Sequence, residues 1–187
     1  MSQVSVIKRN GKRASLDLEK LHRVVFWSCE NLTGVSPSEV EIRSSLQFYD
    51  GIKTTDIQET LIKSAADLIS EDAPNYQYVA GRLISYHLRK EVYGQYEPWP
   101  IKRLVDQNVQ LGFYDAQMAA AYTDADWDRI NSMIRHDRDN EMAYVGMEQM
   151  RGKYLVQNRV TGRIYETPQV AYMLIAATLF QNYPADT

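Results

Sequence analysis

The side chains with the clearest potential for chemistry are cations near a predicted β-hairpin and the helix after it. Lys8 and Arg9 lie in the hairpin, and Lys20 lies on the following helix. Lys90 ends a later helix, and Thr54 adds a hydroxyl at a helix start, where backbone amides favour anions. Several such charge-assisted contacts, at ~1.5–3 kcal/mol each, support micromolar binding of a nucleoside triphosphate. Composition alone instead favours lysines that are simply solvated.

Other chemistries find little support in the sequence. It has no Walker A loop and no G-x-G-x-x-G fingerprint, and its histidines (His22, His87 and His136) lack metal-site spacing. The single cysteine, Cys29, excludes an internal disulfide and is expected to be a small buried hydrophobe. The charged run 136–139 (HDRD) is interpreted as a solvated or salt-bridged segment. We therefore expect no metal site and no catalytic residue.

The composition is that of a globular protein of one domain or two small ones. Of 187 residues, 44% are hydrophobic and 24% are charged, and the formal net charge is -3. A net acidic chain has no global attraction for nucleic acid or anionic membranes. The sequence shows neither a signal peptide nor an apolar run of membrane-spanning length. We expect a cytoplasmic protein that binds neither nucleic acid nor membrane.

The elements that must position the cations are a hairpin and about four helices. Alternating apolar residues over 4–16, with Asn10-Gly11 between the arms, predict the hairpin. Asp17 or Ser15 is expected to cap the first helix, and Ser36 with Glu39 is expected to form a capping box. Apolar periodicity predicts helices over about 17–31, 37–49, 54–69 and 75–93.

A segment with two prolines and a glycine, 94–100, predicts a linker between a domain at 4–95 and a second at 96–187. Beyond it the pattern predicts helices over about 101–111, 122–135 and 141–150, a second hairpin over 154–165, and an apolar helix over 168–180. The fold class expected is mainly α, with an N-terminal β-hairpin that caps a helical bundle.

The sequence resembles a known family. VIKRNG at 6–11 and LEKL at 18–21 are similar to the opening of an ATP-cone domain. More specific segments resemble the large (alpha) subunit of class I ribonucleotide reductase of the bacterial and T-even-like phage type. They are QFYDGIKT at 47–54, DAPNYQY at 72–78, HLRK at 87–90, YGQYEP at 93–98, HDRD at 136–139, KYLVQNRVTG at 153–162 and IYE at 164–166.

The resemblance implies a cone that binds ATP or dATP, with Mg²⁺, to regulate overall activity, and a helical segment that leads toward an α/β barrel. It implies as partners the remainder of the large subunit and a small radical-generating beta subunit, and it allows a homo-oligomer. The nucleotide-binding residues that it implies are Lys8, Arg9, Ala14, Ser15, Leu16, Asp17, Leu18, Glu19, Lys20, Thr54, Gln58 and Lys90. Asp17 is the candidate for contact with the base.

Two positions depart from the family pattern. The pattern has an acidic residue at the position of Ala14, and often a histidine or an acid, linked to dATP inhibition, at Gln58. We therefore expect dATP to bind without driving ring assembly. The family's catalysis uses several cysteines, so this chain, with Cys29 alone, is expected to be inactive by itself. Its end at Thr187 predicts a truncated, split or incomplete large subunit that lacks the barrel.

Two other functions are compatible with a cone. One is a helical protein-interaction module whose nucleotide site has decayed, which Ala14 favours and the retained lysines oppose. The other is a cone attached to a regulator of reductase genes, which would carry a cysteine-rich zinc ribbon that this sequence lacks.

Overall fold

The computed structural model describes residues 4–183, so the chain end at Thr187 lies outside it. The chain divides into two compact units, one formed by Met1–His87 with Asn140–Glu148, the other by Leu88–Asp139 with Gln149–Thr187. The predicted domains 4–95 and 96–187 remain predictions. No helix among the described residues has the length and apolarity needed to cross a membrane.

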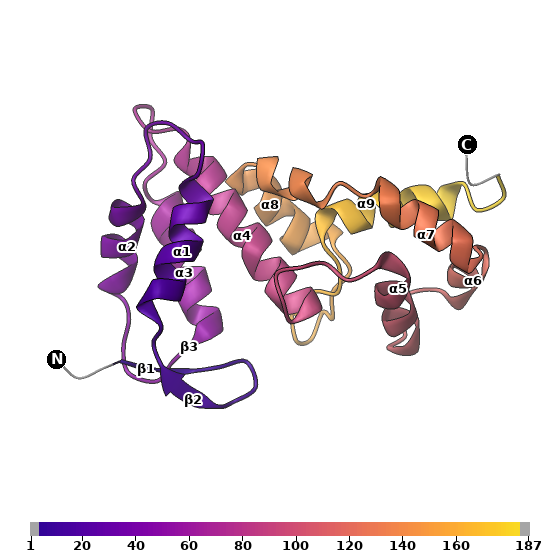
Figure 1. Ribbon diagram of the computed structural model, residues 1–187, viewed down its shortest axis with the longest axis horizontal. Helices are drawn as coiled ribbons and strands as arrows, with labels where there is room; N and C mark the ends of the chain where they lie inside the picture. Colours follow the sequence, from indigo (N-terminus) through magenta and orange to yellow (C-terminus); the bar gives the residue numbers. More distant parts are fainter. Residues whose placement is uncertain (1–3, 184–187) are drawn as a thin grey trace. The chain divides into compact units, whose positions relative to one another are not determined.

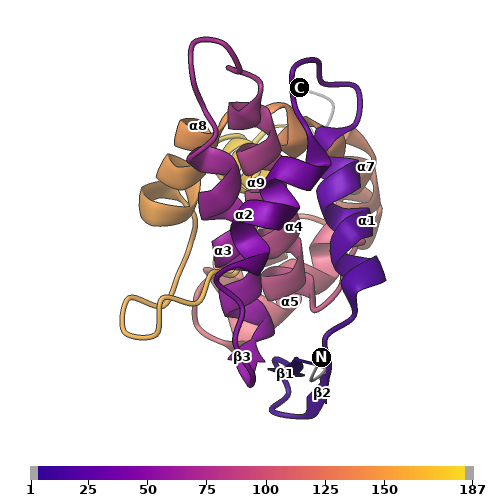
Figure 2. The ribbon, with the colours of Figure 1, turned by 90° about the vertical axis from the view of Figure 1, so that its left-hand side faces the viewer.

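The first unit is a small sheet with a bundle of helices, and the three strands lie together at one end of α1–α3 (Figure 2). Its expected class, mainly α with an N-terminal hairpin, is confirmed (Figure 1). The elements are β1 (Ser5–Ile7), β2 (Arg13–Ser15), α1 (Leu18–Cys29), α2 (Pro37–Ser45), β3 (Ile52–Lys53), α3 (Thr54–Ala66), most of α4 (Tyr76–Tyr93) and most of α8 (Tyr144–Gln149).

The hairpin forms because glycine supplies a left-handed residue at its turn. Lys8 O accepts from Gly11 N at 2.8 Å, Lys8 N donates to Lys12 O at 2.9 Å, and Gly11 has φ 78°. This is a three-residue turn that ends in a glycine bulge, and it needs positive φ at Gly11 alone rather than at Asn10 as well. Asn10 instead accepts a hydrogen bond from Lys12 N at 3.1 Å through its side chain.

A short third strand, β3, completes the sheet in the order β2-β1-β3 and was not predicted. It pairs in parallel with β1, in the register Val6↔Ile52 and Ile7↔Lys53. The strand ends where α3 begins, so the sheet fixes the start of that helix. Val6 and Ile52 are 4% and 2% exposed, which places this face of the sheet against the apolar core.

The core of the first unit comes from the apolar faces of its helices, as the 3.6-residue periodicity predicts. Val25, Val40, Leu61, Val79 and Leu83 are fully buried. Cys29 is also buried, at 7% exposure, which confirms its interpretation as a small core hydrophobe.

The cap of α2 differs from the prediction. Ser36 makes no side-chain capping bond, so the predicted capping box with Glu39 is wrong. The hydroxyl of Tyr76 takes both partners: it accepts from Ser36 N at 2.9 Å and donates to Glu39 Oε2. This tertiary contact raises the pKa of Tyr76 to about 12, first through burial and then through the bond to Glu39.

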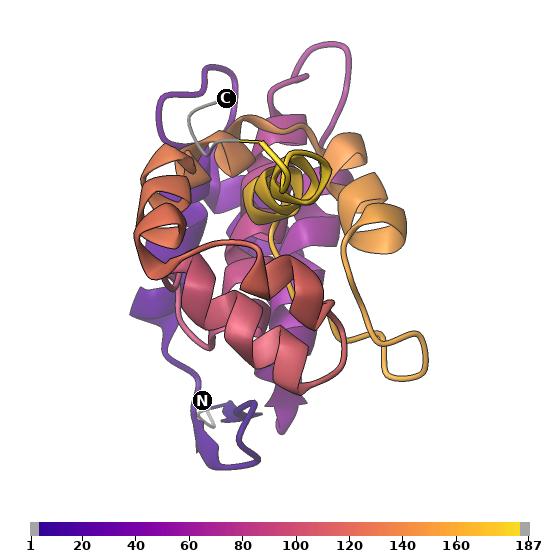
Figure 3. The same cartoon turned by 90° about the vertical axis from the view of Figure 1, so that its right-hand side faces the viewer.

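The second unit is also helical, and Figure 3 shows α5 and α7 side by side. α6, the π-helix and the 3₁₀ helix were not predicted. The predicted second hairpin is present as a loop held by one bridge, Gln157↔Ile164. The elements are the end of α4, α5 (Ile101–Gln110), α6 (Ala116–Ala120), α7 (Asp124–Met133), most of a 3₁₀ helix (His136–Glu141), a π-helix (Met150–Tyr154) and α9 (Pro168–Leu179).

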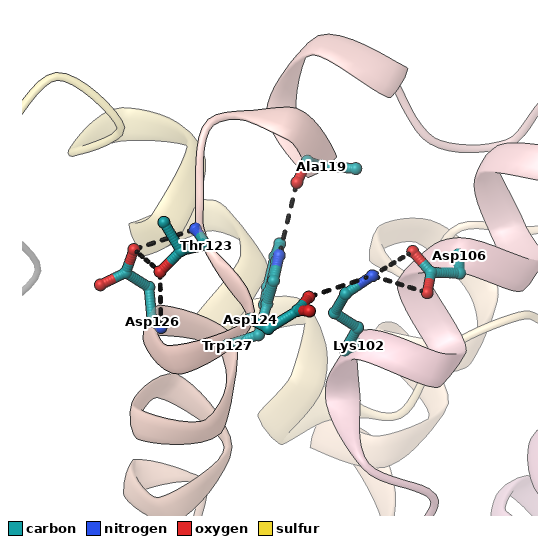
Figure 4. Close-up of polar contacts among 7 residues, drawn as sticks. All are labelled: Lys102, Asp106, Ala119, Thr123, Asp124, Asp126 and Trp127. Atoms are coloured by element: carbon teal, nitrogen blue, oxygen red, sulfur yellow. Dashed lines mark hydrogen bonds and ion pairs between the residues drawn. The ribbon is translucent and has the colours of Figure 1, made fainter.

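Helix α7 begins at a complete capping box, drawn in Figure 4. Thr123 Oγ1 accepts from Asp126 N at 3.2 Å, and the Asp126 carboxylate accepts from Thr123 N at 2.9 Å. One turn into the helix, Trp127 is 1% exposed and donates to Ala119 O at 3.3 Å. The helix predicted over about 122–135 is thus present as α7, and local hydrogen bonds fix its start at Thr123.

The run 136–139, which was predicted to be solvated or salt-bridged, is so only in part. Asp137 is exposed and pairs with Arg135 at 3.0 Å. Asp139 is 1% exposed, and its Oδ1 accepts from Gln169 N at 3.1 Å, at the start of α9. The prediction is wrong for Asp139 because a buried helix N-terminus, 30 residues away, uses its carboxylate as an acceptor.

Candidate functional site

The turn of the hairpin gathers four cations: Lys8, Arg9, Lys12 and Arg13, all exposed. Arg13 donates to Asp50 Oδ2 at 2.9 Å, which ties β2 to the segment before β3. Hydrogen bonds from Ser5, and then the charge of Arg13, hold the pKa of Asp50 below its ordinary value. Positive charge is therefore concentrated at one end of the sheet, on a turn braced by Asp50.

The register of the sheet brings part of this charge to the start of α3. Because Ile7 pairs with Lys53, the next residues along the two parallel strands, Lys8 and Thr54, are neighbours. Lys53 is the N-cap of α3 and provides no side-chain capping bond. The first amides of α3 therefore present the positive end of the helix dipole beside Lys8, an arrangement suited to a phosphate.

Gln58 lies one turn after Thr54, on the same face of α3. Its Oε1 is buried and has no hydrogen-bond partner among the described residues. A buried, unpaired acceptor is costly, and the side-chain amide offers both a donor and an acceptor to a polar ligand. Gln58 therefore fits a polar ligand that reaches α3.

The stretch 14–17 links the sheet to α1, and its side chains point alternately to opposite faces, as in a strand. Ala14 pairs with the buried Val6 and shares its face, whereas Ser15 pairs with Ser5 and faces the other side. Leu16 donates its N–H to the carbonyl of residue 4 at 2.9 Å and is half-buried. The helix-facing side at this point is therefore the methyl group of Ala14, which offers no polar contact.

Asp17, one of the two predicted caps, is the N-cap of helix α1, and its Oδ1 accepts from Lys20 N at 2.9 Å. Leu18, Glu19 and Lys20 follow in its exposed first turn. Leu18 and Glu19, with two residues that the sequence reasoning missed, line an open hollow of about 450 Å³. The missed residues are His22 and Arg23, which helical spacing from Leu18 and Glu19 could have indicated.

Lys90 lies on α4, beyond the division after His87, and is half-buried. Lys90 therefore does not belong to the part of the site that the first unit forms. Across residues 4–183, no group of three His, Cys, Asp or Glu side chains is arranged to hold a metal ion.

Comparison of the sequence with known proteins shows which proteins this chain is similar to. Residues 4–91, which contain the sheet and α1–α3, match the family described as "ATP cone domain". Almost the whole chain is also similar to larger proteins. It is 53% identical over 182 residues to ribonucleoside-diphosphate reductase 1 subunit alpha of Salmonella typhimurium strain LT2, and equally to that of Escherichia coli strain K12. These alignments cover 97% of this chain.

The alpha subunit of Enterobacteria phage T4 is 41% identical over 186 residues. The chain therefore contains an ATP-cone domain at 4–91, and almost its whole length is similar to ribonucleoside-diphosphate reductase alpha subunits. It spans 24% of the length of each of these three relatives.

Proposed function

We propose that the cone binds ATP and dATP at the end of the sheet where the hairpin turn meets α3. The observation that carries this proposal is the register Ile7↔Lys53, which makes Lys8 a neighbour of Thr54 and of the first amides of α3. The buried, unpaired Oε1 of Gln58 one turn further supports a polar ligand on the same face. A triphosphate at this position would neutralise the cations of the turn.

The remaining contacts are proposed from the resemblance. Lys8, Arg9, Lys20, Thr54 and Lys90 bind the phosphates. The stretch 14–20 wraps the nucleoside, and Asp17, whose cap uses only Oδ1, approaches the base. Mg²⁺ would be bound by the phosphates of the nucleotide. In proteins this ion is usually held by substrate phosphates together with only one or two carboxylates.

We further propose that this chain regulates ribonucleoside-diphosphate reduction in the cytoplasm, as the activity-controlling segment of an alpha subunit. Its partners would be the barrel of the large subunit and the small beta subunit. Because Gln58 stands where the family often has histidine, we propose that dATP binds without enforcing an inhibited assembly.

One observation favours a second function. The helix-facing side of β2 carries only the methyl group of Ala14, so one polar contact to a nucleotide is missing. A cone with a decayed site would act as a protein-interaction module. The exposed turn cations argue against this, since loss of ligand removes the reason to keep like charges together.

Calorimetric titration of the chain with ATP and with dATP tests the first proposal. We expect micromolar dissociation constants, weakened about tenfold by Lys20→Ala, because one charge-assisted phosphate contact is worth ~1.5–3 kcal/mol.

The matched control is Lys63→Ala, an exposed lysine in the last turn of α3, far along the helix from Thr54. Its affinity should stay within about twofold of the wild type, as for an unrelated surface residue. An absence of binding heat at high protein concentration would refute nucleotide binding and favour the interaction module.

A further inference from the structure

The segment 149–165 of the second unit is strongly basic in an acidic chain. It contains four cations, Arg151, Lys153, Arg159 and Arg163, and no acidic residue. The formal net charge of the whole chain is -3, so this segment reverses the local sign. None of the residues of the proposed nucleotide site lies in this segment, so that site makes no use of it.

Much of this charge is exposed and forms no ion pair with the described residues, although Glu166 and Glu91 accept hydrogen bonds from the backbone N–H groups of Val156 and Ile164. Lys153 and Arg159 are exposed and form no ion pair within residues 4–183. Arg163 is exposed as well, and its guanidinium packs over the ring of Tyr165 at 5.2 Å. Several acidic residues of this unit cap helices, such as Asp115 and Asp126. The side chains of Lys153 and Arg159 form no such hydrogen bond with the described residues.

The loop that carries these cations is held in one shape by its own hydrogen bonds. Asn158 Oδ1 accepts from Val160 N at 2.9 Å and from Thr161 N at 3.1 Å. Across the loop, Asn158 N donates to Arg163 O at 2.9 Å. Gln157 Nε2 donates to Arg151 O at 3.2 Å, which fastens the loop to the π-helix. A braced loop loses little entropy on binding.

Apolar groups are interleaved with the charges. Val160, at the tip, is 95% exposed, and Tyr154 is 66% exposed. We name the exposed cations and large exposed apolar residues of this segment, Lys153, Tyr154, Arg159, Val160 and Arg163, the basic face. An aliphatic side chain at the most exposed point is suited to an apolar recess in a protein surface, and it contributes nothing to a contact with a phosphate backbone.

We propose that the basic face is a docking surface for an acidic polypeptide segment that also carries aliphatic side chains. Charge complementarity selects the acidic partner, since exposed cations steer opposite charges into an encounter. Val160 and Tyr154 supply the apolar contact that holds the partner once it arrives. This docking surface is independent of nucleotide binding.

A selection with an unbiased probe tests the proposal. A random 12-residue peptide library is displayed on phage and selected on the full chain, with counter-selection on the double variant Lys153→Glu/Arg159→Glu. We expect the enriched peptides to be rich in Asp and Glu with interspersed Leu, Ile or Val. No enrichment, or enrichment of neutral or basic peptides, would overturn the proposal.

The affinities of the enriched peptides then locate the surface. Fluorescence anisotropy should show binding weakened about tenfold or more by the double variant and several-fold by Val160→Ser, and weakened by added salt. The control Arg43→Glu/Lys63→Glu makes the same charge change on exposed helix positions of the other unit, and its affinity for the peptides should stay within about twofold of the wild type.

Equal losses of affinity in both double variants would mean that net charge alone drives binding. Tighter binding of a labelled dT12 oligonucleotide, lost in Lys153→Glu/Arg159→Glu, would assign the face to nucleic acid instead.

Discussion

Replacing Gly81 with alanine is expected to destabilise the first unit, although a change from glycine to alanine inside a helix usually stabilises that helix. Gly81 is buried in α4, and a Cβ atom built on it would lie 2.1 Å from the backbone oxygen of Met142. Backbone atoms cannot rotate aside as a side chain can, so α4 and the segment before α8 must separate. Overpacking of this kind costs ~1–3 kcal/mol or more, against a helix-propensity gain of ~1 kcal/mol.

We expect Gly81→Ala to lower the free energy of unfolding by about 2 kcal/mol and the melting temperature by roughly 4–8 °C. Gly146→Ala is the matched control, since its Cβ would meet only the side-chain Cε of Met142, at 3.8 Å. The control should be neutral or stabilised by up to about 1 kcal/mol. Thermal and urea unfolding of both variants measure the difference. A Gly81→Ala chain as stable as the control would show that Met142 yields without cost.

The parts of the fold that were predictable from sequence are those with local causes. The glycine of Asn10-Gly11 indicates the first hairpin because it alone adopts the left-handed turn conformation at no cost. Asp17 and Thr123 mark the starts of α1 and α7, where each side chain accepts from an amide three residues on. Apolar periodicity then predicts most of the helical core.

Two features that the sequence did not predict, β3 and the cap of α2, depend on residues that are distant along the chain. Two residues, Ile52 and Lys53, form β3 only because β1 is available much earlier in the chain, and so short a run carries no pattern of its own. Glu39 bonds to Tyr76 rather than to its own helix start, which removes the predicted capping box.

The candidate site shows the same division. The cations of the hairpin are visible in the sequence, but their position beside Thr54 follows from the β1–β3 register, which is not. Gln58 was named through family resemblance alone, and its buried, unpaired oxygen is a tertiary feature. His22 and Arg23 lie at helical spacing from residues that had been named, so they could have been found by extending the face of α1.

The second large effect is expected from Asp139→Asn, which should remove a dependence of stability on pH. Burial raises the pKa of Asp139 to about 7, although the charge of Arg89 and the amide of Gln169 oppose the shift. In the unfolded chain the pKa is about 3.9. Between these values the folded state holds a proton that the unfolded state has lost, so the Asp139 contribution to stability falls as pH rises from about 4 to 7.

Three pKa units correspond to about 4 kcal/mol. The amide that replaces the carboxyl group has no proton to exchange in this range, while its oxygen still accepts from Gln169. Relative to wild type, the variant should therefore gain about 4 kcal/mol between pH 4 and pH 8, measured by urea unfolding at each pH. Burial also lowers the pKa of His136 to about 4, but this contribution is present in both proteins and cancels in their difference.

Asp137→Asn is the control for this measurement, on the same 3₁₀ helix. Asp137 is exposed, and the hydrogen bond from Arg135 lowers its pKa. Its contribution to stability is therefore present above about pH 4 and is lost only as pH falls below that value, opposite in sign to Asp139 and small because water screens the pair. Parallel pH curves for wild type and Asp139→Asn would mean that Asp139 is ionised in the folded protein throughout, with Arg89 and the start of α9 compensating fully for its burial.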